Sequence, residues 1–356
     1  MAISLAQHSA LFTQALVATF EDDIQPQLGL SAWFPTVTRG TKYLSIAVRR
    51  HRQLVAVDVQ RCTDPNRNLF SISNEKIFYP PFFSESTDVT ACEGYDMTFG
   101  RGVGLNAEYA AIMVRDAADK MNAMKNKIER AIEKQRASVL QFGTVTMRFG
   151  TVINYSRKAE SMPVFSGANM WSDPTAPIYQ QIQTGIAFLR REGNTTQGAT
   201  VDLLMGASAL SNLMNNTALQ NRAKFFNQIN LVDIKMPQYN NKSGITLHGE
   251  IGVGDARVRL WTYDGYYENN DGTKTSYLDP DIAILLPSDF EGVTGFAGIP
   301  TVFNPNTANQ YIAPKEGAFV TYDLIDPKKK TWDQVIESAP LVIPISVDRI
   351  YSMLTA

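Results

Sequence analysis

The sequence predicts an α+β protein organised around one long helix. The stretch from Leu105 to Phe142 contains neither glycine nor proline and consists mostly of good helix formers. Strand-like segments lie before and after this stretch, and residues 176–314 mix helical with strand-like patterns. Together these three observations indicate the fold class.

The N-terminal region, residues 1–38, is expected to form a short amphipathic helix followed by an extended arm. Its apolar residues recur at helical spacing, and they are Leu5, Leu11, Phe12, Ala15, Leu16 and Phe20. Two later prolines favour an extended chain, because proline disfavours helix in the residue before it. The region carries three carboxylates, those of Glu21, Asp22 and Asp23, and no lysine or arginine.

The segment that follows reverses the sign of the charge. Positions 39 to 61 hold six lysine or arginine residues against one carboxylate, and the densest cluster is Arg49, Arg50 and Arg52. Residues 43–48 and 54–59 have the composition of strands, which predicts a basic hairpin around the cluster. The sequence Arg-Arg-His-Arg is poor turn chemistry, so a longer excursion than a tight turn is expected.

The long helix is predicted over residues 105–142. Its apolar residues keep to one stripe, at Ala110, Met113, Ala117, Met121, Met124, Ile128, Ala131 or Ile132, and Val139. At 1.5 Å per residue, such a helix would be roughly 50 to 60 Å long. Gly143 is expected to end it, since glycine is the common residue just beyond a helix C-terminus.

The rest of the chain alternates short elements, with a domain boundary expected in the Pro-, Ser- and Asp-rich loop at 162–177. The predicted helices span 178–191 and 208–213, with Ser208 as the cap of the second and a continuation to 226 left open. The predicted strands are 144–149, 151–155, 200–205, 257–263, 282–285, 318–325 and 340–354. The sequence Asn-Asn-Asp-Gly at 269–272 predicts a hairpin turn.

Length, charge and cysteine content exclude several classes of protein. The 356 residues leave room for two or three packed units, and a net charge of -2 argues against a general nucleic-acid binder. Only Cys62 and Cys92 are present, without zinc-ligand spacing, so a disulfide framework and a structural zinc site are not expected. No apolar run approaches the roughly 18 residues of a membrane span, and no basic segment opens a secretory signal. A cytoplasmic site of synthesis is expected.

We find no coherent catalytic, cofactor or metal set in the sequence. His8, His51 and His248 are far apart, and each lies in a segment without an evident partner for acid–base chemistry. Ser208 follows Gly-Ala but lacks the second glycine of a nucleophile elbow. The glycines at 100–104 do not have the spacing of a dinucleotide loop, so a joint before the long helix is the simpler interpretation.

Two segments resemble the phage major capsid protein E family, the lambda type. Residues 336–344 read Ile-Glu-Ser-Ala-Pro-Leu-Val-Ile-Pro, and 348–354 read Asp-Arg-Ile-Tyr-Ser-Met-Leu, similar to the end of that family's chains. Residues 263–269, Tyr-Asp-Gly-Tyr-Tyr-Glu-Asn, lead through a hairpin to 277–285, which resembles the family's Leu-Pro-Asp segment before an apolar strand. This chain departs there by reading Leu-Asp-Pro-Asp. The order of elements is also similar over nearly the whole chain.

The resemblance implies a Hong Kong 97 (HK97) type capsid fold. Its parts would be an N-terminal arm at 1–38, an extended loop at 39–99, a peripheral domain at 100–175 and 315–356 with the spine helix, and an axial domain at 176–314. It also implies a shell protein that assembles into hexamers and pentamers in the host cytoplasm and encloses DNA without sequence-specific binding. Scaffolding, portal and decoration proteins are the further partners implied, and the protein would reside in the virion.

An arm and an extended loop have few ways to bury apolar faces within their own chain, so both are expected to lie on neighbouring subunits. The hypothesised inter-subunit contacts are Glu21, Asp22, Asp23, Arg49, Arg50, Arg52, Phe78, Tyr79, Phe82 and Phe83. Two alternatives remain open at this point: another self-assembling phage component such as a tube or decoration protein, and an α/β enzyme with its site in 176–314.

Overall fold

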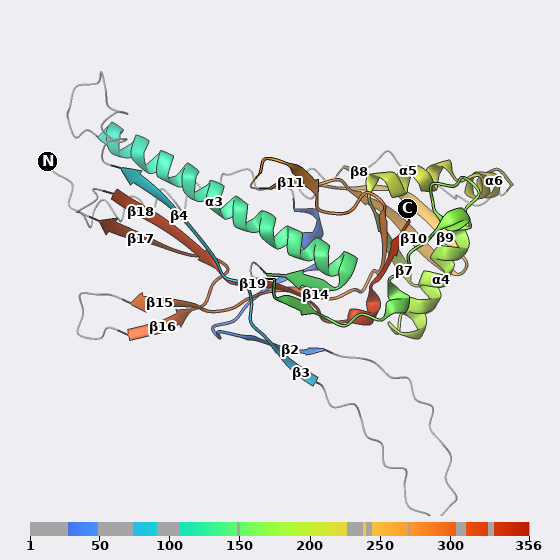
Figure 1. Ribbon diagram of the computed structural model, residues 1–356, viewed down its shortest axis with the longest axis horizontal. Helices are drawn as coiled ribbons and strands as arrows, with labels where there is room; N and C mark the ends of the chain where they lie inside the picture. Colours follow the sequence, from blue (N-terminus) through green and yellow to red (C-terminus); the bar gives the residue numbers. More distant parts are fainter. Residues whose placement is uncertain are drawn as a thin grey trace, which may run out of the picture.

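The computed structural model describes residues 28–48, 74–90, 107–147, 150–225, 238–239, 244–269, 271–303, 311–326 and 331–355. The protein is elongated (Figure 1), with helix α3 (Ala107–Phe142) running along one half and a mixed sheet and helix unit forming the other. Helices and sheets are both present, in the arrangement that the α+β class requires.

Helix α3 confirms the sequence prediction closely. Of its apolar stripe, the buried members are Ala117, Met121, Met124, Ile128, Ile132 and Val139. Gly143 ends the helix with a positive φ of 67°, which glycine adopts without strain. A Cβ atom at Gly143 would also lie 2.5 Å from the Arg157 side chain. Both the backbone conformation and this close contact therefore disfavour a larger residue at position 143.

A three-stranded antiparallel sheet lies beside the first half of α3. Its order is β17 (Val320–Asp326), β18 (Thr331–Ser338) and β4 (Phe83–Thr90). Ile336 at its centre is fully buried, and the Lys127 ammonium group on α3 lies 2.7 Å from the Glu85 carboxylate on β4. Strands from before and after the helix therefore share one sheet beneath it.

A second three-stranded sheet packs against the C-terminal half of α3. Strand β14 (Gly292–Phe296) lies at its centre, parallel to β1 (Thr36–Thr38) and antiparallel to β19 (Pro340–Pro344). Three consecutive residues of β19 are fully buried: Leu341, Val342 and Ile343. The early, middle and late parts of the chain thus meet at one place on the helix.

The other half of the molecule is built on a six-stranded sheet. Its order is β20 (Tyr351–Leu354), β13 (Ile282–Pro287), β7 (Thr200–Met205), β10 (Ala256–Tyr263), β9 (Ile245–Val253) and β8 (Gln238–Tyr239). Strands β7 and β10 are parallel, and the remaining neighbours are antiparallel. Helices α4 (Ile178–Arg191), α5 (Ala207–Asn215) and α6 (Thr217–Phe225) accompany it (Figure 1).

The central strands of this sheet are buried on both faces. On β7, Leu203 belongs to the cluster formed with α4 and α5, whereas Leu204 belongs to the cluster formed with α3. Gly185 lets α4 approach the sheet, because a Cβ atom there would lie 2.5 Å from the Leu285 side chain. Burial on both faces explains why β13 reads as a continuous apolar run rather than as an alternating pattern.

The remaining elements are two-stranded ribbons and short 3-10 helices. The ribbons are β2 (Leu44–Val48) with β3 (Asn74–Phe78), β5 (Thr144–Thr146) with β6 (Val152–Asn154), β11 (Tyr266–Glu268) with β12 (Lys274–Ser276), and β15 (Ile299–Phe303) with β16 (Tyr311–Lys315). The 3-10 helices are η1 (Gly29–Trp33), η2 (Ala159–Ser161), η3 (Gly167–Asn169) and η4 (Val347–Arg349).

The described partner of β2 is β3, and residues 54–59, expected as its partner strand, lie outside the described residues. One sequence expectation is corrected here. Ser208 does not cap α5: the N-cap residue is Gly206, where a Cβ atom would lie 2.5 Å from the Asp279 carbonyl oxygen.

In the part of the chain that the structure describes, no helix is both long enough and apolar enough to cross a lipid bilayer.

Candidate functional site

The ribbon of β2 and β3 leaves the body of the protein from an apolar root. At the root, Leu44 and Phe78 are paired across the two strands, and both are buried. The Phe78 ring meets the Tyr155 ring edge to face, with 5.6 Å between centroids. Figure 1 shows the ribbon extending away from the sheets that hold this root. The core therefore fixes where the excursion begins and ends.

Exposed aromatic side chains surround this root. Tyr43 precedes β2, and Tyr79 and Phe82 lie in the link from β3 to β4. Tyr79 is 62% exposed and Phe82 is 52% exposed. Isolated exposed aromatics are common, but three at the base of one projecting ribbon form a surface suited to contact with another molecule.

The other sequence-predicted contact residues divide into two groups. Phe78 is buried in its own core and Phe83 packs partly against that core, so these two rings, expected among the inter-subunit contacts, face the inside of their own subunit. Their strands are held by β2 and β18, which turns both side chains inward. The charged candidates lie outside the described residues, and they are Glu21, Asp22, Asp23, Arg49, Arg50 and Arg52.

A buried carboxylate holds the N-terminal segment on α3. The Glu133 side chain is fully buried, and its Oε1 accepts hydrogen bonds from the Leu30 backbone N–H at 2.7 Å and the Tyr263 hydroxyl at 3.0 Å. Its Oε2 accepts a hydrogen bond from Arg136 Nη1 at 2.9 Å. Burial, reinforced by the Glu133 charge, raises the pKa of Tyr263, so its hydroxyl stays a donor at physiological pH.

Arg136 extends this network to the second sheet. Its Nε and Nη2 groups both donate to Thr294 Oγ1 at 3.2 Å, and the Thr294 hydroxyl donates to the Phe34 carbonyl oxygen at 3.3 Å. The Glu133–Arg136 pair therefore joins α3 to η1, β14 and β10. Buried charges are tolerated when they are paired and hydrogen-bonded in this way.

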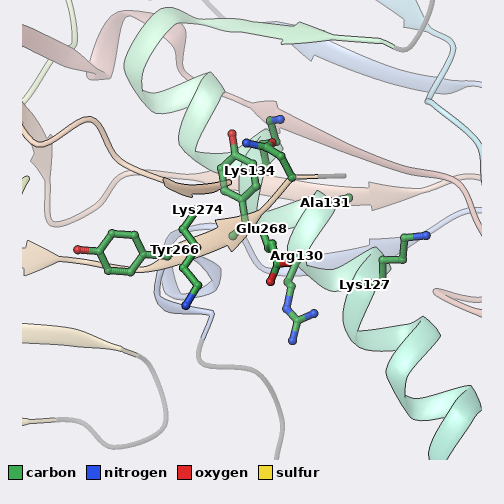
Figure 2. Close-up of a pocket in the computed structure, with 9 residues that line it drawn as sticks. Lys127, Arg130, Ala131, Lys134, Tyr266, Glu268 and Lys274 are labelled. Atoms are coloured by element: carbon green, nitrogen blue, oxygen red, sulfur yellow. The ribbon is translucent and has the colours of Figure 1, made fainter. Parts of the chain in front are cut away.

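A cationic groove runs between α3 and the β11–β12 hairpin (Figure 2). It has a volume of about 580 Å³, and its charged lining residues are Lys127, Arg130, Lys134, Glu268 and Lys274. A second groove of about 500 Å³ adjoins it, shares Arg130 and Tyr266, and includes Leu28. Sequence reasoning misses this surface, although the cations at 127, 130 and 134 recur at helical spacing on the polar face of α3.

Neither groove is lined by a histidine or a cysteine. Thr262 lines the second groove, and its Oγ1 atom lies 2.6 Å from Nε2 of His248, whose pKa is lowered by burial. Among the described residues, no group of three or more His, Cys, Asp or Glu side chains is placed to hold a metal ion. His8, His51, Cys62 and Cys92 lie outside the described residues.

Comparison with known proteins gives the family. The family model described as "Phage major capsid protein E" matches residues 74–354, which is most of the chain. The chain belongs to the phage major capsid protein E family. It is a structural protein that forms the shell of a phage capsid. No curated protein sequence matches it.

Solved structures agree with this family. A prophage protein of E. coli CFT073, assigned as a capsid protein, superimposes with a TM-score of 0.61 at 17% identity, covering 100% of both chains. A phage-related protein from Bordetella bronchiseptica RB50 gives a TM-score of 0.51 at 11% identity, covering 96% of this chain and 97% of that one. The family member described here has the HK97-type capsid fold.

The Glu133 network yields a stability prediction. Glu133→Gln keeps the shape but leaves the Arg136 charge buried without its counter-ion, which is expected to lower the free energy of unfolding by about 3 to 5 kcal/mol. The measurement is urea unfolding of dissociated subunits. The control is Glu160→Gln, whose carboxylate is 68% exposed and is expected to cost about 1 kcal/mol or less. Equal costs for the two variants would contradict the prediction.

Proposed function

We propose that this chain is the major subunit of the head shell of a tailed phage, that it assembles into hexamers and pentamers, and that these close around packaged DNA. The observation that carries the proposal is the projecting β2–β3 ribbon, whose root is fixed in the core while exposed aromatic rings surround it. Exposed aromatic surface of this kind is stabilised when another copy of the chain covers it, whereas in a monomer it stays in contact with water. Assembly would take place in the host cytoplasm, with scaffolding, portal and decoration proteins as the further partners.

The proposed domain division is an arm at 1–38, an extended loop at 39–99, a peripheral domain at 100–175 and 315–356, and an axial domain at 176–314. The two clusters of buried residues lie on opposite faces of the six-stranded sheet, so the cluster around α3 includes residues of the proposed axial domain such as Leu204 and Ile284. The strand pairing favours two adjustments: β4 belongs with the peripheral strands, and β20 belongs with the axial sheet.

The loop and the first part of the arm of each subunit are proposed to lie on neighbouring subunits, whereas residues 28–38 of the arm pack in their own core through Leu30, Phe34 and the pairing of β1 with β14. Arg49, Arg50 and Arg52 would contact an acidic surface of a neighbour, and Tyr79 and Phe82 would add apolar contact at the root. Such contacts are heterologous, because the loop of one copy meets a different surface of the next, and repetition by rotation closes a ring.

The chain is proposed to have no catalytic role. Support comes from the capsid family to which the chain belongs, and from groove linings that are rich in lysine, arginine and tyrosine, with the carboxylates Glu268 and Asp264. Among the described residues, the alternative of an enzyme site in residues 176–314 has only the contact between Thr262 and His248 in its favour.

The arginine cluster is tested by changing Arg49, Arg50 and Arg52 together to Ser. The expected result is a large loss of shells with unchanged subunit folding, because the contacts removed are between copies. Electron microscopy counts the shells, and circular dichroism with thermal melting reports the fold. Normal shells from the triple variant would refute the proposed role.

The aromatic root is tested with Tyr79→Ser and Phe82→Ser combined. We expect fewer shells and a melting temperature close to that of the unchanged protein, since both rings are more than half exposed. Phe78→Ala is the contrasting variant, because removing a buried ring should cost about 3 to 5 kcal/mol in the free energy of unfolding. A double variant with a clearly lowered melting temperature and a normal yield of shells would contradict this prediction.

Enclosure of DNA without sequence readout is also testable. In a filter-binding assay at physiological salt, dissociated subunits should retain two unrelated duplexes equally and weakly, at Kd values no tighter than about 10⁻⁴ to 10⁻⁶ M. A preference of tenfold or more for one duplex would contradict the prediction.

A further inference from the structure

The cationic groove between α3 and the β11–β12 hairpin has more positive charge than its own chain neutralises. Lys127, Arg130 and Lys134 lie along one face of α3, and Lys274 faces them from the hairpin (Figure 2). Glu268 is the carboxylate in the lining. These side chains are exposed at their tips, so an incoming anionic group would reach them without any rearrangement of the core.

The local partners account for only part of this charge. Lys127 is paired with Glu85 at 2.7 Å, and the Lys134 ammonium lies 4.5 Å from the centroid of the Tyr267 ring. Among the described residues, no ion pair involves Arg130 or Lys274, although Glu268 is the cross-strand partner of Lys274. The groove therefore has a net positive charge that a further anionic group would neutralise.

The chain's own N-terminal arm is one source of such a group. Leu28 lines the groove that adjoins the cationic one, and the Leu30 backbone N–H is fixed to Glu133 at 2.7 Å. Asp23 and Glu21 precede Leu28 by five and seven residues. At about 3.3 to 3.6 Å per extended residue, this length reaches roughly 17 to 25 Å from Leu28.

We propose that the acidic segment Glu21–Asp23 docks in the cationic groove of its own chain. Three consecutive carboxylates meet Arg130, Lys134 and Lys274, and the arm is thereby pinned along the spine helix. Each exposed ion pair is worth about 0.2 to 1 kcal/mol, so binding of this segment depends on several pairs acting together and weakens as salt increases.

This docking rests on the proposed function and refines it. With residues 21–23 held on their own subunit, the residues before them, which carry the helically spaced apolar side chains, are the part of the arm that extends to a neighbour. The groove then sets the direction in which the arm leaves the subunit, and the acidic residues act as its anchor rather than as the contact between copies.

The first experiment is zero-length carbodiimide cross-linking of the full chain as dissociated subunits, in a mixture of ¹⁵N-labelled and unlabelled protein. Mass spectrometry should find residues 21–23 linked to Lys127, Lys134 or Lys274, with both peptides carrying the same isotope. Links between differently labelled peptides in statistical proportion would place the segment on a neighbour and overturn the proposal. Absence of these links would overturn it as well.

Charge reversal supplies the second experiment. Arg130→Glu, which leaves every lysine and carboxylate used for cross-linking in place, should reduce same-chain links by about fivefold, the effect of losing roughly 1 kcal/mol of pairing. Combining that variant with Asp22→Arg, which keeps Glu21 and Asp23, should restore the links. The matched control is Arg115→Glu, an exposed arginine on the same helix but outside the groove, which should leave the links unchanged.

The outcomes are separable from those of the proposed function. Shells that form normally while same-chain links are absent would reject the docking and keep the shell assignment. Same-chain links in subunits that never assemble would support the docking and count against the proposed assembly. If the links are absent and the groove variant instead loses affinity for duplex DNA, the groove serves phosphate groups and the docking proposal fails.

Discussion

The buried carboxylate of Glu133 is the interaction on which the arrangement of this protein depends. It sits on the spine helix, where the apolar stripe would otherwise be continuous, and receives hydrogen bonds from the N-terminal segment and from β10. Arg136 neutralises it and reaches Thr294 on β14. A charge so deeply buried is tolerable only when all these donors are in place, so the network specifies one relative arrangement of helix, sheet and arm.

Around that network, the long helix is shared by two units that would otherwise be separate. Its first half covers the β17–β18–β4 sheet, and its C-terminal half packs on β19 and on one face of the six-stranded sheet. The opposite face of that sheet is covered by α4 and α5. A subunit built this way is stiff along its length, while the β2–β3 and β15–β16 ribbons extend from it (Figure 1). Rigid bodies with projecting ribbons suit a shell in which each copy must touch several others.

The sequence predicts what local chemistry controls and misses what long-range pairing controls. The spine helix, α4 and the β11–β12 hairpin follow from periodicity, from Gly143 and from the Asn-Asn-Asp-Gly turn. The pairing of β4 with β18 joins residues about 250 positions apart, and no local pattern encodes it. The inward direction of Phe78 and the role of Glu133 were missed for the same reason, since each depends on what packs against the residue. The family resemblance supplied the fold where periodicity alone was insufficient.

Strand β20 closes an edge of the six-stranded sheet that would otherwise be open. Tyr351 and Met353 complete the core around α4, and their strand pairs with the edge of β13. A chain truncated before residue 351 would keep an open apolar edge, which favours aggregation over a native surface. Synthesis must therefore proceed through residue 354 before this edge is protected.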